Sequence, residues 1–85
     1  MNQTIEDFAR SEITKQCESL PTANQRIFRL IYGRKTTVRG IATRSVEDAE
    51  RLSIPDLVTE IPAEKLDWAL QQLENTHRKL NKQIA

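Results

Sequence analysis

Apolar residues recur at helical spacing near the end of the chain and predict one long amphipathic helix from Pro62 to Ile84. They fall three and four positions apart, as on one side of an α-helix: Leu66, Ala69, Leu70, Leu73, Leu80 and Ile84. The opposite side is polar except for Trp68, which lies about 200° round the helix from Leu66. We expect the other segments to pack around this helix.

The start of the chain predicts a helix that begins at Thr4 and runs to about Glu18. The Thr4 hydroxyl can cap the free amides of the first turn, and Glu6 and Asp7 suit the positive end of the helix dipole. The expected buried side of this helix consists of Ile5, Phe8, Ala9, Ile13, Cys17 and then Leu20.

A second helix is predicted from Thr22 to Tyr32. Thr22 is expected as the N-cap, with Gln25 completing a capping box, and Gly33 is expected to leave the helix in a left-handed conformation. The buried candidates are Ile27, Phe28, Leu30 and Ile31, and the expected exposed side carries Arg26 and Arg29.

Residues 34–44 lack helical periodicity and are interpreted as an exposed basic loop, in which an extended piece over residues 36–39 has no evident partner strand. Ser45 then begins a helix of about two turns, and the residues expected to face inward are Val46, Ala49 and Leu52. Pro55 suits the first position of a fourth helix over residues 55–60, with Leu57, Val58 and Ile61 on its apolar side, and Pro62 begins the last helix in the same way.

These elements predict an all-α fold: a compact bundle of four to five helices in a single domain over residues 1–85, with the basic loop after the second helix. The 85 residues are 38% hydrophobic, which suits one small core. One cysteine cannot form an internal disulfide, and no apolar run approaches the length of a membrane span. We therefore expect a soluble protein of the cytoplasm that does not bind membranes.

Charge is distributed unevenly although the net charge is only +1. Residues 47–67 carry seven acids and two bases, whereas residues 19–46 carry no acid. The six bases of that middle segment are Arg26, Arg29, Arg34, Lys35, Arg39 and Arg44. This basic segment can meet an acidic surface of a partner or the phosphates of a nucleic acid.

Residues able to carry enzyme chemistry are few. Cys17 is expected to be a small core residue, and His77 is expected to be partly buried, neutral and bonded to a carbonyl. The chain has one cysteine, one histidine and no glycine-rich phosphate loop. Without further ligands at zinc spacing we expect no metal, no cofactor and no catalysis.

The stretch from Leu20 to Gly33 resembles the opening of the promoter-recognition helix-turn-helix of bacterial sigma factors. The matching positions are Leu20, Pro21, Arg26, Leu30, Tyr32 and Gly33. The resemblance then ends, because only Ile41-Ala42 echoes the next helix and no arginine-rich recognition helix follows. It implies a nucleic-acid-binding regulator that uses residues 26–44, which we keep as an alternative.

A looser pattern covers most of the chain: an acidic helix with IEDFAR, a Leu-Pro helix that ends in Tyr32, and a last helix with KLDWA. It resembles a group of small uncharacterised proteins encoded by bacteriophages of enteric hosts. The chain departs from that group between about Gly33 and Ser53, where it carries an additional basic loop and short helix. The resemblance implies a phage origin, the host cytoplasm as location and a non-enzymatic accessory role.

Together these features predict a phage-type accessory protein that binds a host or phage protein with an acidic surface and inhibits or redirects it by occlusion. A defence or nucleic-acid-processing complex is the kind of target considered. The predicted partner-binding residues are Arg26, Arg29, Tyr32, Arg34, Lys35, Arg39, Arg44 and Trp68. Trp68 has a second interpretation, in which the preceding short helix or the first helix covers it. A third hypothesis is a homo-oligomer that forms through a seam of Leu66, Leu73 and Leu80.

Overall fold

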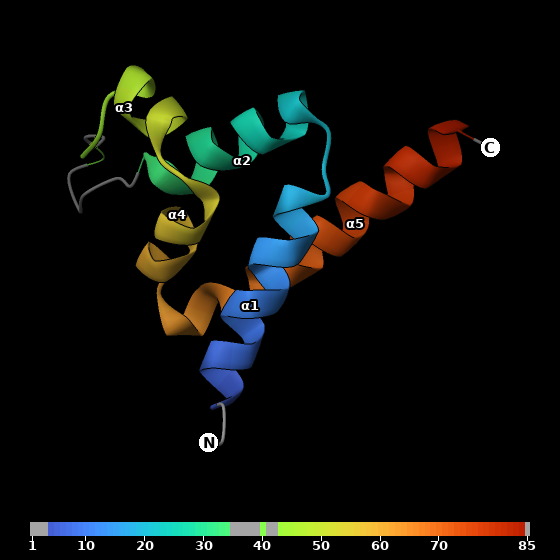
Figure 1. Cartoon of the computed structure of the whole chain (residues 1–85), viewed down its shortest axis with the longest axis horizontal. Coiled ribbons are helices and arrows are strands. Elements are labelled where there is room, and N and C mark those ends of the chain that lie inside the picture. Colours follow the sequence, from blue (N-terminus) through green and yellow to red (C-terminus); the bar gives the residue numbers. More distant parts are fainter. Residues whose placement is uncertain (1–3, 35–39, 41–42, 85) are drawn as a thin grey trace.

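The computed structural model of the chain describes residues 4–34, 40 and 43–84 (Figure 1). Over these residues the protein is an all-α bundle, as the sequence predicts. Five α-helices and one 3-10 turn follow in order: α1 (Ile5–Glu18), α2 (Thr22–Gly33), α3 (Val46–Arg51), α4 (Ile54–Glu60), the 3-10 turn η1 (Ala63–Lys65) and α5 (Leu66–Ile84).

One apolar cluster joins α1, α2, α4 and α5. Its largest fully buried side chains are those of Ile13, Cys17, Leu57, Val58 and Leu73. α1 packs most extensively against α5 and next against α4, whereas α3 packs chiefly against α2. In Figure 1 the first turns of α1 and the last turns of α5 extend beyond the other helices.

Serine and threonine caps fix three of the helix starts. Thr4, Ser45 and Ser53 each accept a hydrogen bond from the backbone amide three residues further on, at 3.0, 3.1 and 3.2 Å respectively. The first two caps confirm the prediction. The third was not predicted, and it begins α4 at Ile54, so that Pro55 occupies the second helical position instead of the first.

The predicted capping box of α2 is wrong. The helix begins at Thr22, and Pro21 occupies the N-cap position without a side-chain capping bond. The Gln25 side chain turns towards the end of α1, where its amide nitrogen donates to the carbonyls of Glu18 at 3.1 Å and Leu20 at 2.9 Å. Gln25 therefore fixes the α1–α2 connection and does not close a box with Thr22.

The left-handed exit predicted at Gly33 is also wrong. Gly33 is the last residue of α2 and is buried. A Cβ atom added at this position would lie 3.4 Å from the Cβ of Ala49. The missing side chain of Gly33 thus allows α2 and α3 to approach closely. Within the described residues the positive φ occurs at Gly40, at 79°.

The last helix begins later than predicted. Pro62 occupies the N-cap position of η1, and α5 begins at Leu66 after that turn. The predicted apolar stripe is largely confirmed, because Leu66, Ala69 and Leu73 are buried and Leu70 and Leu80 are partly buried. Leu66 and Leu73 pack into the protein's own core. They are therefore not available for a homo-oligomer interface through Leu66, Leu73 and Leu80.

Five apolar residues predicted to face the core are instead exposed: Ile5, Phe8, Ile27, Ile31 and Val46. For α1 the reason is its projecting first turns, which no neighbouring helix covers (Figure 1). For α2 the helix is rotated so that Phe28 and Tyr32 point inward. The exposed residues of α1 and α2 therefore form two apolar surfaces without a partner in the described chain.

Candidate partner-binding groove

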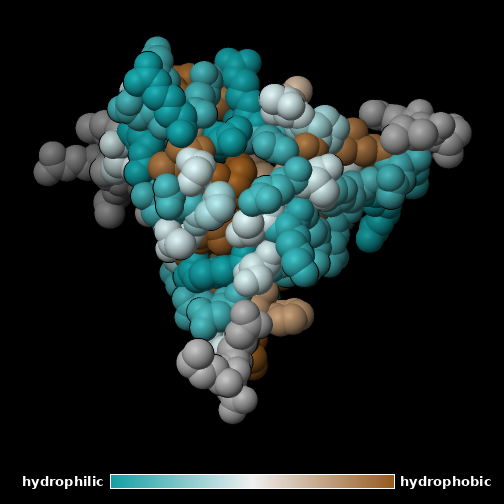
Figure 2. Space-filling model, viewed as in Figure 1, coloured by the Kyte–Doolittle hydropathy of each residue, from teal (hydrophilic) through white to brown (hydrophobic). Residues whose placement is uncertain are grey.

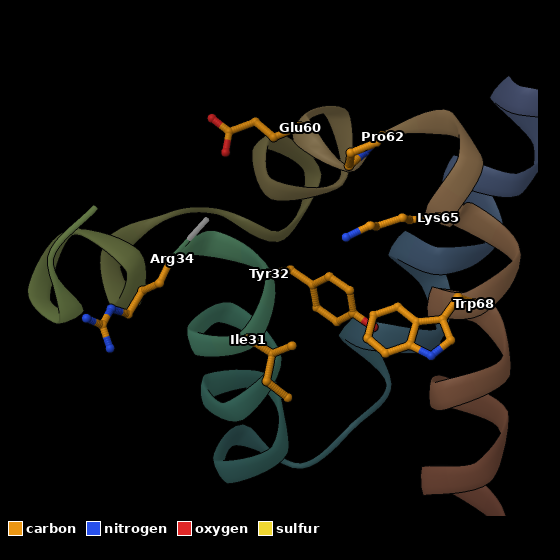
Figure 3. Close-up of a pocket in the computed structure, with 7 residues that line it drawn as sticks. All are labelled: Ile31, Tyr32, Arg34, Glu60, Pro62, Lys65 and Trp68. Atoms are coloured by element: carbon orange, nitrogen blue, oxygen red, sulfur yellow. The ribbon is translucent and has the colours of Figure 1, made fainter. Parts of the chain in front are cut away.

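Tyr32 and Trp68 join α2 to α5 through their rings. Figure 3 shows the two helices on either side with both aromatic side chains between them. The ring centroids of Tyr32 and Trp68 lie 5.6 Å apart at 58°, and those of Tyr32 and Phe28 lie 4.4 Å apart at 36°. Trp68 nevertheless remains 50% exposed, so neither α1 nor α4 covers it.

The hydroxyl of Tyr32 is buried and has no hydrogen-bond partner. In Figure 3 it points towards the indole of Trp68. Burial raises the pKa of Tyr32 above 10.0, because the charged phenolate would be poorly solvated there. An unsatisfied buried hydroxyl is a cost to stability, and such costs are concentrated at functional sites.

A hollow of about 370 Å³ lies beside this aromatic pair, and its lining includes Ile31, Lys65 and Pro62. In Figure 3 the Lys65 side chain extends across the hollow from the end of η1, just before α5. The charged ends of Arg34 and Glu60 point away from it. The hollow is therefore lined mainly by apolar side chains, and Lys65 is the cation that extends into it among the side chains drawn.

Two smaller hollows continue this one along α5. One of about 70 Å³ is lined by Ile27 and Ile31 of α2 with Gln72 and Thr76 of α5. The other, of about 300 Å³, shares Gln72 and Thr76 and adds basic side chains near the end of α5: Arg78, Lys79 and Lys82. These hollows share lining residues, and we call the surface that they form the α2/α5 groove: Ile27, Ile31, Tyr32, Lys65, Trp68, Gln72, Thr76, Lys79 and Lys82. Its far end, at Lys79 and Lys82, is lined by α5 alone.

The sequence predicted two members of this groove, Tyr32 and Trp68. The α5 members recur at three- and four-residue spacing, which marks one helix face, and this signal could have added Gln72, Lys79 and Lys82. Ile27 and Ile31 could not have been found this way, because their apolar character predicts burial.

The predicted basic residues do not gather on the groove. Arg26 is paired with Glu50 at 2.8 Å, and Arg29 Nε donates to the Leu52 carbonyl at 2.7 Å. Arg29 is thereby partly buried, not exposed as predicted. Arg34 Nε lies 3.4 Å from the Arg44 carbonyl, and Lys35 and Arg39 lie outside the described residues.

Arg44 forms a two-pronged ion pair with Glu60. Its Nη1 and Nη2 each lie 2.9 Å from a carboxylate oxygen of Glu60, and Nη1 also donates to the Gly33 carbonyl at 2.7 Å. The hydrogen bonds and charge of Glu60 raise the pKa of Arg44. Arg44 thus ties the end of α2 to the end of α4.

Cys17 and His77 have structural surroundings, as the sequence predicts. His77 Nε2 lies 2.9 Å from the Gln16 carbonyl, which can only accept, so this nitrogen carries the proton. Burial raises the pKa of the Cys17 thiol from 9.0 to about 11, while Arg29 opposes the rise and Glu18 adds to it. Cys17 is therefore a protonated core residue at neutral pH.

Two other features are absent from the residues that the structure describes. No helix in that part of the chain combines the length and apolar character needed to cross a membrane. Its histidine, cysteine and acidic side chains form no group of three that could hold a metal ion.

No protein-family model, curated protein or solved structure matches this chain. The resemblance to phage-encoded proteins therefore stays a prediction. The function has to be argued from the groove itself.

Proposed function

We propose that the protein is a non-enzymatic accessory protein that binds a helical segment of a partner protein in the α2/α5 groove. The observation that carries this proposal is a half-exposed Trp68 held by Tyr32 at the wall of an apolar hollow. Aromatic residues in such positions concentrate the free energy of protein interfaces. The groove lies between two helices, where an amphipathic helix can place its apolar side.

The charges along the groove specify the partner further. Lys65 lies at one end, and Lys79 and Lys82 lie at the other, with apolar side chains between them. The partner segment is therefore apolar in the middle and acidic towards its ends. Its capture would act by occlusion, since a bound segment is withheld from its other contacts.

Trp68 is the only tryptophan of the chain, so its fluorescence reports directly on the groove. The test is to select binders from a displayed library of helical peptides and to titrate them against the protein while following Trp68 emission. Selected peptides should carry apolar residues three or four positions apart with flanking Asp or Glu, and should shift the emission to shorter wavelength. Peptides that bind without changing the emission would contradict the proposal.

A matched pair of variants locates the site. Ile31→Ser removes an exposed apolar side chain from the groove, whereas Val46→Ser removes one from α3. The first substitution should weaken peptide binding about tenfold, the effect of one partly buried aliphatic side chain. The second should leave it unchanged, and equal effects of both would overturn the assignment.

The nucleic-acid alternative has less support. Arg26, Arg29 and Arg44 engage their guanidinium groups in bonds within the chain, which leaves them less available to phosphates. A salt titration with duplex DNA separates the two functions. Binding that falls steeply with salt and survives Ile31→Ser would favour the alternative, and no binding at low salt would remove it.

A further inference from the structure

Two apolar surfaces lack a partner among the described residues, and one of these surfaces lies outside the groove. At the start of α1, Ile5 is 91% exposed and Phe8 is 63% exposed. In Figure 2 apolar atoms protrude at this end of the molecule beside the grey terminal residues. The groove exposes Ile27, Ile31 and Trp68 at 53%, 59% and 50%.

The two surfaces carry opposite charge. The exposed end of α1 holds Glu6 and Asp7 on either side of the apolar pair, and Glu6 is paired with Arg10 at 2.6 Å. The groove is bounded by Lys65, Lys79 and Lys82. Ile5 and Phe8 are three positions apart and lie on one side of the helix. The start of α1 thus offers an apolar pair beside a carboxylate, Asp7, that can face Lys65 at one end of the groove.

Contacts within the chain hold the start of α1 in place. Arg10 Nη1 donates to the carbonyls of Val58 at 2.6 Å and Ile61 at 2.9 Å, and His77 binds the Gln16 carbonyl at the other end of α1. α1 is therefore fixed against α4 and α5 from Arg10 to Gln16, while its first turns project from the bundle. Its exposed first turns can reach a groove only on a second molecule.

We propose that the first two turns of α1 of one copy bind in the α2/α5 groove of a second copy, with Ile5 and Phe8 against Ile31 and Trp68. This inference rests on the groove of the proposed function and names a second copy of the chain as its occupant. A partner helix would then have to displace α1 of the second copy, which makes self-association a competitor of partner binding.

The test uses two variants that each keep one surface. The double variant I5S/F8S keeps the groove and its fluorescent Trp68, and W68A keeps the start of α1 but does not contain tryptophan. Adding W68A to I5S/F8S should shift the Trp68 emission to shorter wavelength as α1 enters the groove. The matched control is the triple variant I5S/F8S/W68A, which has neither surface and should cause no shift.

The contribution of charge is measured in the same titration. Lys65→Glu in the fluorescent component should weaken the interaction about two- to fivefold at low salt, as expected for an exposed ion pair. Light scattering on the unmodified protein should give a mass that rises with concentration, and I5S/F8S should stay monomeric. Circular dichroism checks that the variants are folded.

The outcomes separate this inference from the proposed function. If W68A and the triple variant give the same response, or the unmodified protein stays monomeric at all concentrations, self-association through α1 is overturned. Helical peptides that still shift the Trp68 emission would then leave the groove as a site for another protein. Loss of both responses would remove the groove as a binding site.

Discussion

At the scale of single residues, Tyr32 combines two opposing contributions to stability. Its ring packs between Phe28 and Trp68, whereas its hydroxyl is buried without a partner. The ring contacts favour the folded state, and the hydroxyl opposes it because it loses hydrogen bonds to water on folding. Substitutions at this position can separate the two.

Tyr32→Phe should therefore stabilise the protein by about 1 kcal/mol, since it removes the unsatisfied hydroxyl and keeps the ring. Urea unfolding followed by circular dichroism measures the change in free energy of unfolding. Tyr32→Ala is the control and should destabilise by about 3 kcal/mol or more through loss of the ring. A Phe variant less stable than the unmodified protein would show that the hydroxyl has a partner in solution.

Cys17 makes stability depend on alkaline pH. Its folded-state pKa is about 11 against 9.0 for an unperturbed thiol, so the folded state retains its proton more strongly than the unfolded state. This contribution to stability is complete below pH 9.0 and is lost as the pH rises through about 11. Tyr32, whose pKa is also raised by burial, acts in the same direction.

The measurement is urea unfolding at a series of pH values, with Cys17→Ala as the comparison. The substitution should flatten the decline in stability above pH 9.0, and native Cys17 should react with a thiol reagent only on unfolding. Rapid labelling of the folded protein would contradict the burial of this thiol.

At the scale of elements, the predicted helices are confirmed where a cap and a regular apolar stripe agree. Thr4 and Ser45 begin helices as predicted, and Leu66, Ala69 and Leu73 are buried. These signals are local, so the sequence contains them. The prediction that α2 buries Ile27 and Ile31 is wrong because the rotation of a helix depends on its neighbours, which local periodicity does not specify.

The groove, too, could be predicted from the sequence only in part. Trp68 stood out as the apolar residue on the polar side of its helix, and Tyr32 as the aromatic end of α2. Their ring contact depends on how α2 and α5 lie beside each other. That arrangement depends on contacts between residues distant in the sequence, which no sequence spacing predicts. Such a contact elsewhere in the fold joins Arg10 of α1 to the Val58 and Ile61 carbonyls at the end of α4.

Arg10 makes such a connection between elements, because its Nη1 donates to two carbonyls at the end of α4. One is the Val58 carbonyl, which also accepts from the Ile61 amide at 3.2 Å, and the other is the Ile61 carbonyl. Arg10→Met keeps the apolar part of the side chain and removes these bonds. It should destabilise the protein by about 1–3 kcal/mol, the cost of losing hydrogen bonds from a charged donor to partly buried carbonyls.

Arg26→Met is the matched control, since the Arg26 side chain is 64% exposed and its pair with Glu50 lies at the surface. It should change the free energy of unfolding by less than about 1 kcal/mol. Both values come from urea unfolding of the two variants. Similar losses for Arg10 and Arg26 would mean that the α1–α4 bonds add nothing beyond ordinary surface contacts.

At the scale of the whole molecule, the helices divide by how they are held. α1, α4 and α5 share the apolar cluster, whereas α3 packs chiefly against α2. α3 contributes Ala49 as its buried residue, where it lies against Gly33. A short helix with few apolar contacts is held only weakly by packing. Its hydrogen bonds and ion pairs therefore matter more than those of the core helices.

The main connection of this kind is Arg44, which precedes α3 and binds both the Gly33 carbonyl at the end of α2 and Glu60 at the end of α4. Arg44→Lys keeps the positive charge but loses the planar guanidinium group, whose several N–H donors reach both sites at once. Amide hydrogen exchange of α3 should accelerate in this variant, while that of α1 and α5 stays unchanged. Arg26→Lys, which alters an exposed contact between α2 and α3, is the control and should have the smaller effect on α3. Equal acceleration across all helices would instead make Arg44 part of the global stability of the fold, and would contradict a separately held α3.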